Sequence, residues 1–271
     1  MFKKQNIFDA GEDYFLIYKR ILTQERTKKE IKFLQNIIKN LFKIKKIHIL
    51  DLACGFGRHA IPLAKLGFEV LGVDNNEYFL NLAIKHKKRL KLNNLNFIKN
   101  DMREINFCDR FDLAINMFTS FGYFRDEKEN IKVIKNIWRA LKSKGYFVLD
   151  LENPHIWLTS ILTKSYINKK GTLVLKDNKI NIKDEPRNSI ITKITYEPWN
   201  QILCLERIFL KKDNNKIRRK EYKGEFRLYT LPQIKTYLEL CGFKIKNIYG
   251  DYNCNNYHPM KSYRMIFIAR K

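Results

Sequence analysis

A short loop with two glycines, between two apolar runs, constrains the fold of this chain most. The first run, residues 47–52, ends in a loop that contains Gly55 and Gly57, and a stretch with a helical pattern follows. The second run, residues 68–73, ends in Asp74. Strand–helix–strand units with parallel strands have this order, because glycine lets the backbone turn sharply after the first strand. The sequence therefore predicts an α/β sheet whose first turn lets a ligand approach the backbone closely.

Two classes of adenosine cofactor are bound by such a unit. Gly55, Gly57 and Ala60 fit the spacing of the dinucleotide fingerprint, and Asp74 lies near the position of the acid that holds the ribose of NAD. Asp51 favours a different ligand. A carboxylate beside the loop suits the sulfonium and the amino group of S-adenosylmethionine (SAM) better than it suits a pyrophosphate. Both ligands remain open on these residues alone.

The segment 51–57, Asp-x-Ala-Cys-Gly-x-Gly, resembles motif I of class I SAM-dependent methyltransferases. This motif often has glycine at the position of Ala53, where alanine is a common variant. The resemblance implies that the cofactor is bordered by Asp51, Ala53, Gly55 and Gly57. It also implies that Asp74 holds the ribose hydroxyls. Arg58 would reach the edge of the cofactor cleft and pair with a carboxylate there, or else it is a surface residue at the start of a helix.

The rest of the chain follows the order of the same family. A strand pattern at 95–99 runs into Asp101 and Met102, which by the resemblance would hold the adenine ring. A strand pattern at 111–117 leads into an aromatic loop like that of small-molecule members, and Met117 would wall the methionine portion of the cofactor. A helix pattern and a fifth strand pattern come next, as the family requires.

These elements predict an α/β fold: a seven-stranded, mostly parallel, doubly wound methyltransferase sheet with N-terminal cap helices and an antiparallel β insertion that serves as a lid. The expected parts are cap helices at 1–44, a SAM-binding, Rossmann-like domain at 45–153 and 229–271, and an inserted antiparallel subdomain at 154–228. Alternating apolar residues between turn signals indicate the inserted strands. The segment that follows the insertion, through Gly242-Phe243, resembles the ending of small-molecule methyltransferases with such an insertion.

Candidate catalytic residues lie far apart in the sequence. A methyltransferase needs a nucleophile aligned with the methyl group, and it needs a general base only where that nucleophile carries a proton. The candidates for acceptor binding or proton transfer are Tyr123, Tyr229 and His258, with Glu152 and Tyr257 as further bases. Taken singly, each of them is better explained as a structural or solvent-exposed residue. No group of His, Cys and carboxylates has the spacing of metal ligands, so we expect no metal site.

An aromatic residue of the N-terminal helices is a further candidate for the cofactor site. In related methyltransferases a helix in this place often presents an aromatic ring to the cofactor. Tyr14 or Tyr18 could do so here. The alternative is that both rings are core residues of a cap helix.

Composition bears on the setting in which the chain works. Hydrophobic residues make up 45% of its 271 residues, enough for a sizeable core. The five cysteines lack any C-x-x-C pair, which argues against a disulfide framework and a structural zinc site. No apolar run approaches the length that spans a bilayer, and the first residues have no pattern of a secretory signal. We therefore expect a cytoplasmic protein without a membrane span.

The predicted function is transfer of a methyl group from SAM to an oxygen or nitrogen of a small-molecule acceptor by in-line displacement. The net charge of +25 would attract nucleic acid, so an RNA methyltransferase is the alternative. The lysines are spread along the chain, however, and residues 116–119, Asn-Met-Phe-Thr, differ from the Asn/Asp-Pro-Pro-aromatic motif of base-amino methyltransferases. An NAD-dependent oxidoreductase and a non-catalytic SAM-binding protein are less favoured alternatives.

Overall fold

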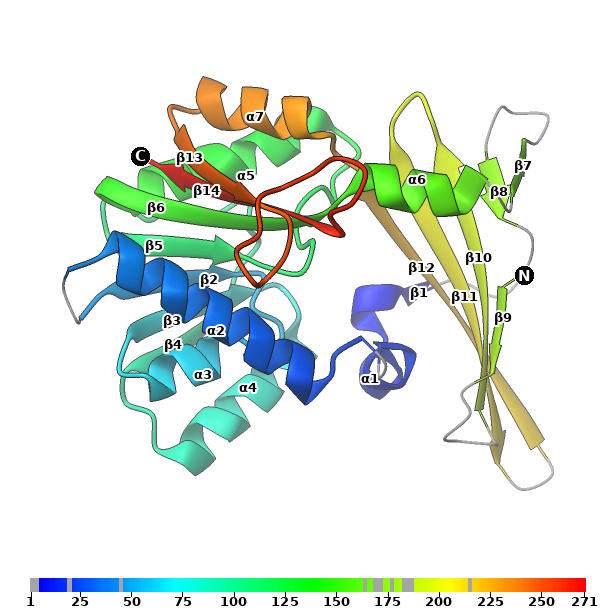
Figure 1. Ribbon diagram of the computed structural model, residues 1–271. Coiled ribbons are helices and arrows are strands. Elements are labelled where there is room, and N and C mark those ends of the chain that lie inside the picture. Colours follow the sequence, from blue (N-terminus) through cyan, green and yellow to red (C-terminus); the bar gives the residue numbers. More distant parts are fainter. Residues whose placement is uncertain are drawn as a thin grey trace. The chain divides into compact units, whose positions relative to one another are not determined.

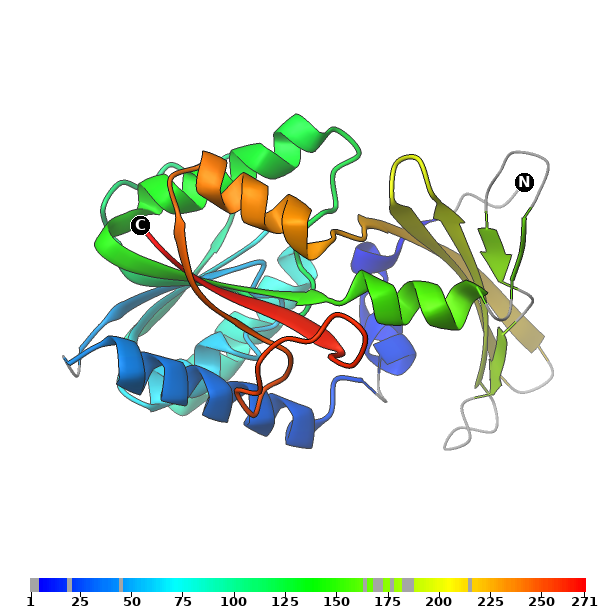
Figure 2. The same ribbon diagram turned by 45° about the horizontal axis from the view of Figure 1, so that its top comes forward.

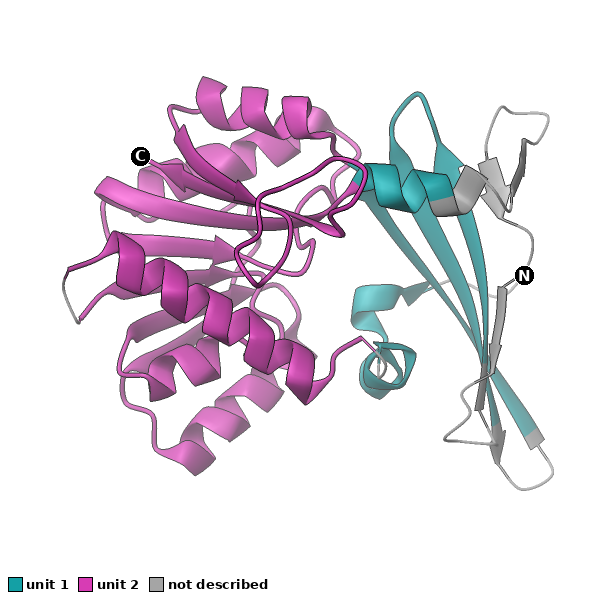
Figure 3. Ribbon diagram, viewed as in Figure 1, with its two compact units in different colours: residues 1–20, 154–228 teal, residues 21–153, 229–271 magenta. Residues whose placement is uncertain are grey.

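The computed structural model describes residues 5–18, 21–43, 46–162, 165–167, 173–175, 178–181, 188–213 and 216–271. The chain forms two compact units (Figure 3): residues 21–153 with 229–271, and residues 1–20 with 154–228. We call the first the sheet unit and the second the insertion unit. The prediction of a separate cap at 1–44 stays a prediction, and the two N-terminal helices fall into different units.

The sheet unit contains a seven-stranded sheet in the order β13-β14-β6-β5-β2-β3-β4 (Figure 1). Its strands are β2 (His48–Leu52), β3 (Glu69–Asp74), β4 (Leu95–Lys99), β5 (Phe111–Asn116), β6 (Leu141–Glu152), β13 (Lys244–Tyr249) and β14 (Arg264–Arg270). Strands β2 to β6 run parallel, whereas β14 is antiparallel to β6 and to β13. The predicted seven-stranded, mostly parallel sheet is thus confirmed.

Helices cover both faces of this sheet (Figure 2). They are α2 (Gln24–Leu41), α3 (Ala60–Lys65), α4 (Glu77–Leu90), α5 (Glu127–Ala140) and α7 (Leu231–Leu240). Successive strand residues point to opposite faces, so Ile49 packs in the cluster with α2 and α3 while Leu50 packs in the cluster with α5 and α7. This alternation buries both faces of β2 and leaves the ends of the strands as the places where polar side chains can gather.

Helix α2 shows how the local sequence sets an element. Thr23 caps its first turn by accepting a hydrogen bond from the backbone N–H of Arg26 at 3.1 Å. Its buried side chains recur at helical spacing and pack against the sheet: Ile31, Phe33, Leu34, Ile37 and Ile38. Glu30 is a buried charge on the same face and is fully covered. A charge in that position requires partners, and they come from Arg26 on the same helix and from Arg58 and His59 after β2.

The insertion unit is built on a second, largely antiparallel sheet in the order β1-β12-β11-β10-β8-β7, with β9 also paired to β10. Its elements are β1 (Gln5–Asn6), a short 3-10 helix (Ile7–Asp9), α1 (Glu12–Tyr18), α6 (Pro154–Leu162), β7 (Ser165–Ile167), β8 (Leu173–Leu175), β9 (Asn178–Asn181), β10 (Asn188–Glu197), β11 (Ile202–Asp213) and β12 (Lys216–Arg227). Part of the predicted insertion at 154–228 lies outside the described residues. The extra antiparallel strands that the sequence predicts are present.

Helix α1 belongs to the core of the insertion unit. Its residues Tyr14, Leu16 and Ile17 pack against a cluster that includes Phe209 of β11 and Tyr222 of β12. Asp13 is buried and accepts a hydrogen bond from the Tyr222 hydroxyl at 2.5 Å. Among the described helices, none is long and apolar enough to cross a membrane.

Candidate functional site

The expected cofactor loop lies where β2 ends, beside the point at which the strand order reverses between β2 and β5. Ligands of open α/β sheets bind at such a switch point. The loop has left-handed backbone at Ala53 (φ 60°), Gly55 (φ 54°) and Gly57 (φ 81°). A Cβ on Gly57 would lie 3.0 Å from side-chain carbons of Ile61 and Phe97, so this position requires glycine for packing as well as for its backbone.

Two buried acceptor oxygens beside this loop lack a donor, and we call the pair, Asp51 Oδ2 and Asn116 Oδ1, the donor-poor site. Within the described part of the chain neither oxygen has a hydrogen-bond partner, and both side chains are at most 1% exposed. The amide of Asn116 donates to the carbonyl of Leu52 at 3.0 Å. Buried polar atoms are normally paired, so two orphan acceptors on adjacent strands mark a place for a ligand that brings donors.

The pKa of Asp51 reflects its burial, although the backbone N–H of Ala60 acts against the rise. Burial raises the pKa of Asp51 to about 7, against the opposing charge of Arg58, and the nearby Asp74 adds to the rise. A cationic ligand group beside the carboxylate would favour its ionised form and remove the penalty. The donor-poor site is therefore suited to an ammonium or another positive group.

Asp74, at the end of β3, is tied to the glycine loop. Its Oδ2 accepts a hydrogen bond from the Gly55 N–H at 2.7 Å, and its Oδ1 accepts one from the Asn76 N–H at 2.8 Å. Burial raises the pKa of Asp74, while these N–H groups act against the rise. Each carboxylate oxygen keeps lone pairs that can accept from hydroxyl groups. The residue thus holds the loop and can still bind a diol.

Asp101, after β4, is held by its neighbour Arg103. The guanidinium donates to Oδ1 at 3.0 Å and to Oδ2 at 2.7 Å, and these hydrogen bonds lower the pKa of Asp101. Arg103 also lies over the ring of Phe124, with its Cζ 4.3 Å from the ring centroid. Met102 packs against the core cluster of α5 and α7. The expected contacts of Asp101 and Met102 with an adenine ring stay predictions.

Arg58 follows the glycine loop and is directed into the protein. Its side chain is 8% exposed and pairs with Glu30 of α2. Glu30 also accepts from Arg26 Nε at 2.9 Å and contacts His59 Nε2 at 2.9 Å. Burial by itself would raise the pKa of Glu30, but the hydrogen bond of His59 and the charges around it hold that pKa well below its usual value. The carboxylate that Arg58 binds is therefore one of the protein's own.

The loop after β5 carries two strained residues. Phe118 (φ 61°) and Thr119 (φ 58°) have left-handed backbone without being glycine, and such positions cost roughly 1–3 kcal/mol each. Asp150, at the end of β6, holds both: its Oδ2 accepts the Phe118 N–H at 2.9 Å and its carbonyl accepts the Thr119 N–H at 2.9 Å. The guanidinium carbons of Arg26 and Arg58 lie 4.8 and 5.1 Å from the centroid of the Phe118 ring.

Arg264, at the start of β14, completes the support of this loop. Its Nε donates to Asp150 Oδ1 at 2.8 Å and its Nη2 donates to Thr119 Oγ1 at 3.1 Å. The Tyr252 hydroxyl donates to Asp150 Oδ2 at 2.8 Å. The carboxylate of Asp150 thus has three donors, and every oxygen is satisfied. We call the buried ionic groups on this side the arginine–carboxylate network: Arg26, Glu30, Arg58, Asp150 and Arg264.

Glu152 lies next to this network and differs from its neighbours. Its Oε1 is 3.4 Å from Arg264 Nη1, whereas its Oε2 is buried and has no partner in the described ranges. Burial raises the pKa of Glu152, although Arg264 and Arg26 oppose the rise. Sequence reasoning named Glu152 as a possible base but missed Arg26, Glu30 and Arg264. Arg264 meets Asp150 across 114 residues and Glu30 meets Arg58 across 28, whereas the Arg26–Glu30 pair is four residues apart on one helix.

The three predicted catalytic residues have different surroundings. Tyr229 is 2% exposed, and its hydroxyl donates to Glu127 Oε1 at 2.7 Å. His258 is exposed in the loop between β13 and β14, where its Nδ1 accepts the Met260 N–H at 3.2 Å. Tyr123 is half-buried in the segment before α5. Their catalytic roles stay predictions. Among the described residues, no group of three or more His, Cys, Asp or Glu could hold a metal ion.

Two other predicted cofactor residues, Met117 and Tyr14, belong to different units. Met117 is buried and packs in the cluster with α2 and α3, directly after Asn116. Tyr14 lies in the insertion unit, where its ring stacks on that of Tyr18 at a centroid distance of 4.5 Å. Whether either contacts the cofactor stays a prediction.

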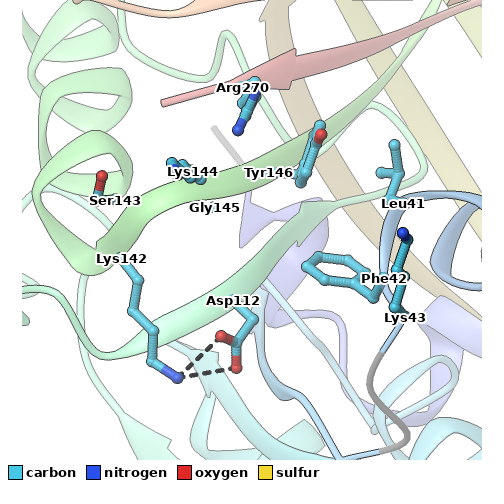
Figure 4. Close-up of a pocket in the computed structure, with 10 residues that line it drawn as sticks. All are labelled: Leu41, Phe42, Lys43, Asp112, Lys142, Ser143, Lys144, Gly145, Tyr146 and Arg270. Carbon is cyan, nitrogen blue, oxygen red and sulfur yellow. Dashed lines mark hydrogen bonds and ion pairs between the residues drawn. The ribbon is translucent and has the colours of Figure 1, made fainter.

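A cavity of about 300 Å³ lies where β5 and β6 begin, at the amino ends of the parallel strands (Figure 4). It is lined by Leu41, Phe42, Lys43, Asp112, Lys142, Ser143, Lys144, Gly145, Tyr146 and Arg270. Lys142 Nζ donates to both carboxylate oxygens of Asp112, at 2.9 and 3.0 Å. The glycine loop is at the carboxyl ends of the strands, so this basic cavity is separate from the candidate cofactor site.

Known proteins resemble the chain both in sequence and in fold. Residues 49–145 match the family model described as "Methyltransferase domain". The chain is 26% identical over 228 residues to "Putative methyltransferase YqeM" of Bacillus subtilis (strain 168), covering 84% of this chain and 85% of that one. It is 26% identical over 239 residues to "Glycine/sarcosine N-methyltransferase" of Aphanothece halophytica, covering 86% and 80%. A solved "S-adenosylmethionine-dependent methyltransferase" from Clostridium acetobutylicum ATCC 824 has a TM-score of 0.79 at 19% identity, covering 95% of this chain and 97% of that one.

Proposed function

Because the chain is a SAM-dependent methyltransferase of the class I fold, we propose that it methylates an oxygen or nitrogen of a small-molecule acceptor by in-line displacement. The observation that carries this proposal is the donor-poor site beside the glycine loop. It offers two buried acceptor oxygens at the switch point of the sheet, and neither has a hydrogen-bond donor among the described residues. The amino group of SAM is a cation that can supply the missing donors.

The residues around the loop fit the parts of SAM. The ammonium group would bind at Asp51 and Asn116, with Met117 walling the methionine portion. The open backbone at Gly55 and Gly57 would allow close approach, while the ribose hydroxyls would bind the remaining lone pairs of Asp74. Asp101 and Met102 would hold the adenine, as the family resemblance implies, and Tyr14 would contribute its ring. Ala53 and Arg58 belong to the glycine loop and its end, so their backbone would border the cofactor.

When bound, SAM supplies a methyl group on a positively charged sulfur, and the sulfur keeps the electron pair of the broken C–S bond. The chain itself has to align the acceptor and exclude water. The loop of Phe118 and Thr119 is held rigidly by Asp150 and Arg264 beside the cofactor site. A rigid loop keeps its geometry at low reorganisation cost, which suits an alignment task. Tyr123, Tyr229 and His258 remain the proposed residues for acceptor binding.

Two observations favour a small-molecule acceptor over nucleic acid: the activity named for one relative, and the pairing of basic residues in the insertion unit with acids. One relative that spans most of both chains is a glycine/sarcosine N-methyltransferase. The net charge is what suggests nucleic acid, and several basic residues of β12 in the insertion unit are paired with acids. Arg219 pairs with Glu221, Lys220 with Asp13 and Lys223 with Glu225. Exposed pairs of this kind reduce the field that a phosphate backbone would meet.

The proposal is tested by following the release of S-adenosylhomocysteine from SAM in the presence of small acceptors, and of transfer RNA in parallel. We expect turnover with small molecules and none with RNA. Turnover with RNA that persists at physiological salt would reverse the choice of acceptor. Failure to bind S-adenosylhomocysteine would contradict the whole proposal.

A further inference from the structure

The carboxyl edge of the sheet divides into two halves. The proposed cofactor residues occupy the ends of β2, β3 and β4 and the first residues after β5. The acceptor must approach the methyl group from the side opposite the sulfur, because displacement is in line. The half that remains for it is formed by the loop after β5, the end of β6 and the start of β14.

The charged groups on that half are satisfied, with one exception. Asp150 has Arg264, Tyr252 and the Phe118 N–H as donors to its carboxylate. Glu152 Oε2, two residues along β6, is buried and has no partner within the residues that the structure describes. The other oxygen of Glu152 has only the long 3.4 Å contact with Arg264.

The arginines around Glu152 compensate its charge only in part. Arg264 is matched at short distance by Asp150, while Arg26 and Arg58 share Glu30. In a chain with a net charge of +25, a buried carboxylate oxygen without a cation is unexpected. A ligand that brings both an N–H donor and a positive charge would complete it.

We infer that Glu152 binds the ammonium nitrogen of an amine acceptor through its Oε2 and takes one proton from it, so that the acceptor class is a primary or secondary amine. This inference rests on the proposed methyltransferase function. The proton moves from nitrogen to the carboxylate, which leaves a lone pair on nitrogen. That lone pair forms the new N–C bond as the C–S bond of the sulfonium breaks, and the electron pair of the C–S bond stays on sulfur. Glu152 then releases the proton to solvent.

The chemistry of a carboxylate base selects an amine over an alcohol. Transfer of a proton from a buried ammonium to a buried carboxylate converts two charges into two neutral groups, and low-dielectric surroundings favour this. Burial also raises the pKa of Glu152, which brings it closer to that of the ammonium. A hydroxyl is nearly as weak an acid as water, whose pKa is about 15.7, so a carboxylate cannot deprotonate it effectively.

The test compares the wild type with Glu152→Gln and Glu152→Asp on matched acceptor pairs: ethylamine and ethanol, glycine and glycolate, glucosamine and glucose. The control variant is Glu239→Gln, since Glu239 is an exposed glutamate on α7 that faces Lys235 at 3.9 Å. Released S-adenosylhomocysteine and the mass of the methylated product are measured. We expect turnover only with amines, a fall of about 100-fold or more in kcat/KM for Glu152→Gln, a smaller fall for Glu152→Asp, and no change in the control.

Two further readouts separate a role in chemistry from a structural role. In calorimetry on protein saturated with S-adenosylhomocysteine, the amine that is turned over should bind at least tenfold more weakly to Glu152→Gln. In the pH profile, the wild type should lose kcat/KM towards acid pH, and the variant should lack this limb. The groups that face Glu152 are Arg264 from β14, Arg26 from α2 and Asp150 from β6. The two arginines stay charged throughout this pH range.

Each outcome decides the inference. Methylation of the hydroxyl member of a pair, or amine turnover that survives Glu152→Gln, overturns it. Binding of S-adenosylhomocysteine without turnover of any amine in the panel also overturns it, while the proposed methyltransferase function stands. Absence of S-adenosylhomocysteine binding contradicts the proposed function itself.

Discussion

The arginine–carboxylate network and the donor-poor site lie on the same edge of one sheet, and both contain buried acids. In the network, Glu30 and Asp150 each accept several charged or neutral donors. In the donor-poor site, Asp51 is as deeply buried but has an oxygen without a partner among the described residues. The difference separates acids that hold the fold from an acid that awaits a ligand.

One chemical change can therefore have opposite effects in the two regions. Replacing a paired carboxylate by an amide removes the charge that its arginines need. Replacing an unpaired buried carboxylate by an amide removes a desolvation penalty. The predictions below use this contrast, from the largest expected effect to the smallest.

Arg264→Met should have the largest effect on stability. It leaves Asp150 buried without its cation and frees the strained loop at Phe118 and Thr119. We expect the free energy of unfolding in urea to fall by about 3–5 kcal/mol. Adding Asp150→Asn to this variant should recover part of the loss, because the unpaired charge is then removed. A loss below about 1 kcal/mol would mean that the network does not hold the loop.

Glu30→Gln should destabilise the protein at neutral pH by about 2–4 kcal/mol, since Arg26 and Arg58 lose their shared carboxylate. The pKa of Glu30 is depressed in the folded state, so its contribution is present above the ordinary value of 4.5 and is lost as pH falls below that value. Urea unfolding across this range should show a smaller acid-induced loss in the variant than in the wild type. Equal pH dependence in both proteins would contradict the assignment.

Asp51→Asn should stabilise the ligand-free protein by about 1–3 kcal/mol above pH 7. The folded-state pKa of Asp51 is raised from 3.8 to about 7, so the stability of the wild type falls as pH rises between these values. The variant lacks this fall, and its gain should therefore vanish at acid pH. Thermal unfolding of the wild type and the variant at pH 4 and pH 8 measures the fall in wild-type stability and the gain of the variant. A destabilised variant at pH 8 would show that Asp51 is paired within the protein.

Asp101→Asn should have the smallest effect on folding. The ion pair with Arg103 is partly exposed, so its loss should change the free energy of unfolding by no more than about 1 kcal/mol. The affinity for S-adenosylhomocysteine should fall by about fivefold, because one hydrogen bond to the adenine amino group is weakened. Unchanged affinity in a calorimetric titration would remove Asp101 from the cofactor site.

Local sequence patterns predict the sheet and the glycine loop well. The loop around Gly55 and Gly57 depends on neighbouring residues and on strands whose apolar runs are continuous, so both can be recognised from the sequence. The network cannot, because its partners are brought together only by the completed fold. Asp150 and Arg264 are 114 residues apart and meet because β14 pairs antiparallel with β6.

The placement of helix α1 has a similar cause. Its apolar face is visible in the sequence, but its partners are not. Asp13 meets Tyr222 across 209 residues, and Tyr14 packs against the cluster that includes Phe209. Periodicity shows that a helix has a face to bury, and it does not show which sheet will cover that face. Sequence reasoning therefore predicted cap helices without identifying this packing in the insertion unit, and the cap itself stays a prediction.

The most direct test of the account is a calorimetric titration of the wild type and Asp51→Asn with S-adenosylhomocysteine, which keeps the amino group of SAM. Asp109→Asn, at an exposed aspartate that pairs with Lys271, is the matched control. The account predicts binding by the wild type and the control, and at least tenfold weaker binding by Asp51→Asn even though this variant unfolds at a higher temperature at pH 8. Binding by Asp51→Asn as tight as that of the wild type would contradict the claim that the donor-poor site receives the cofactor.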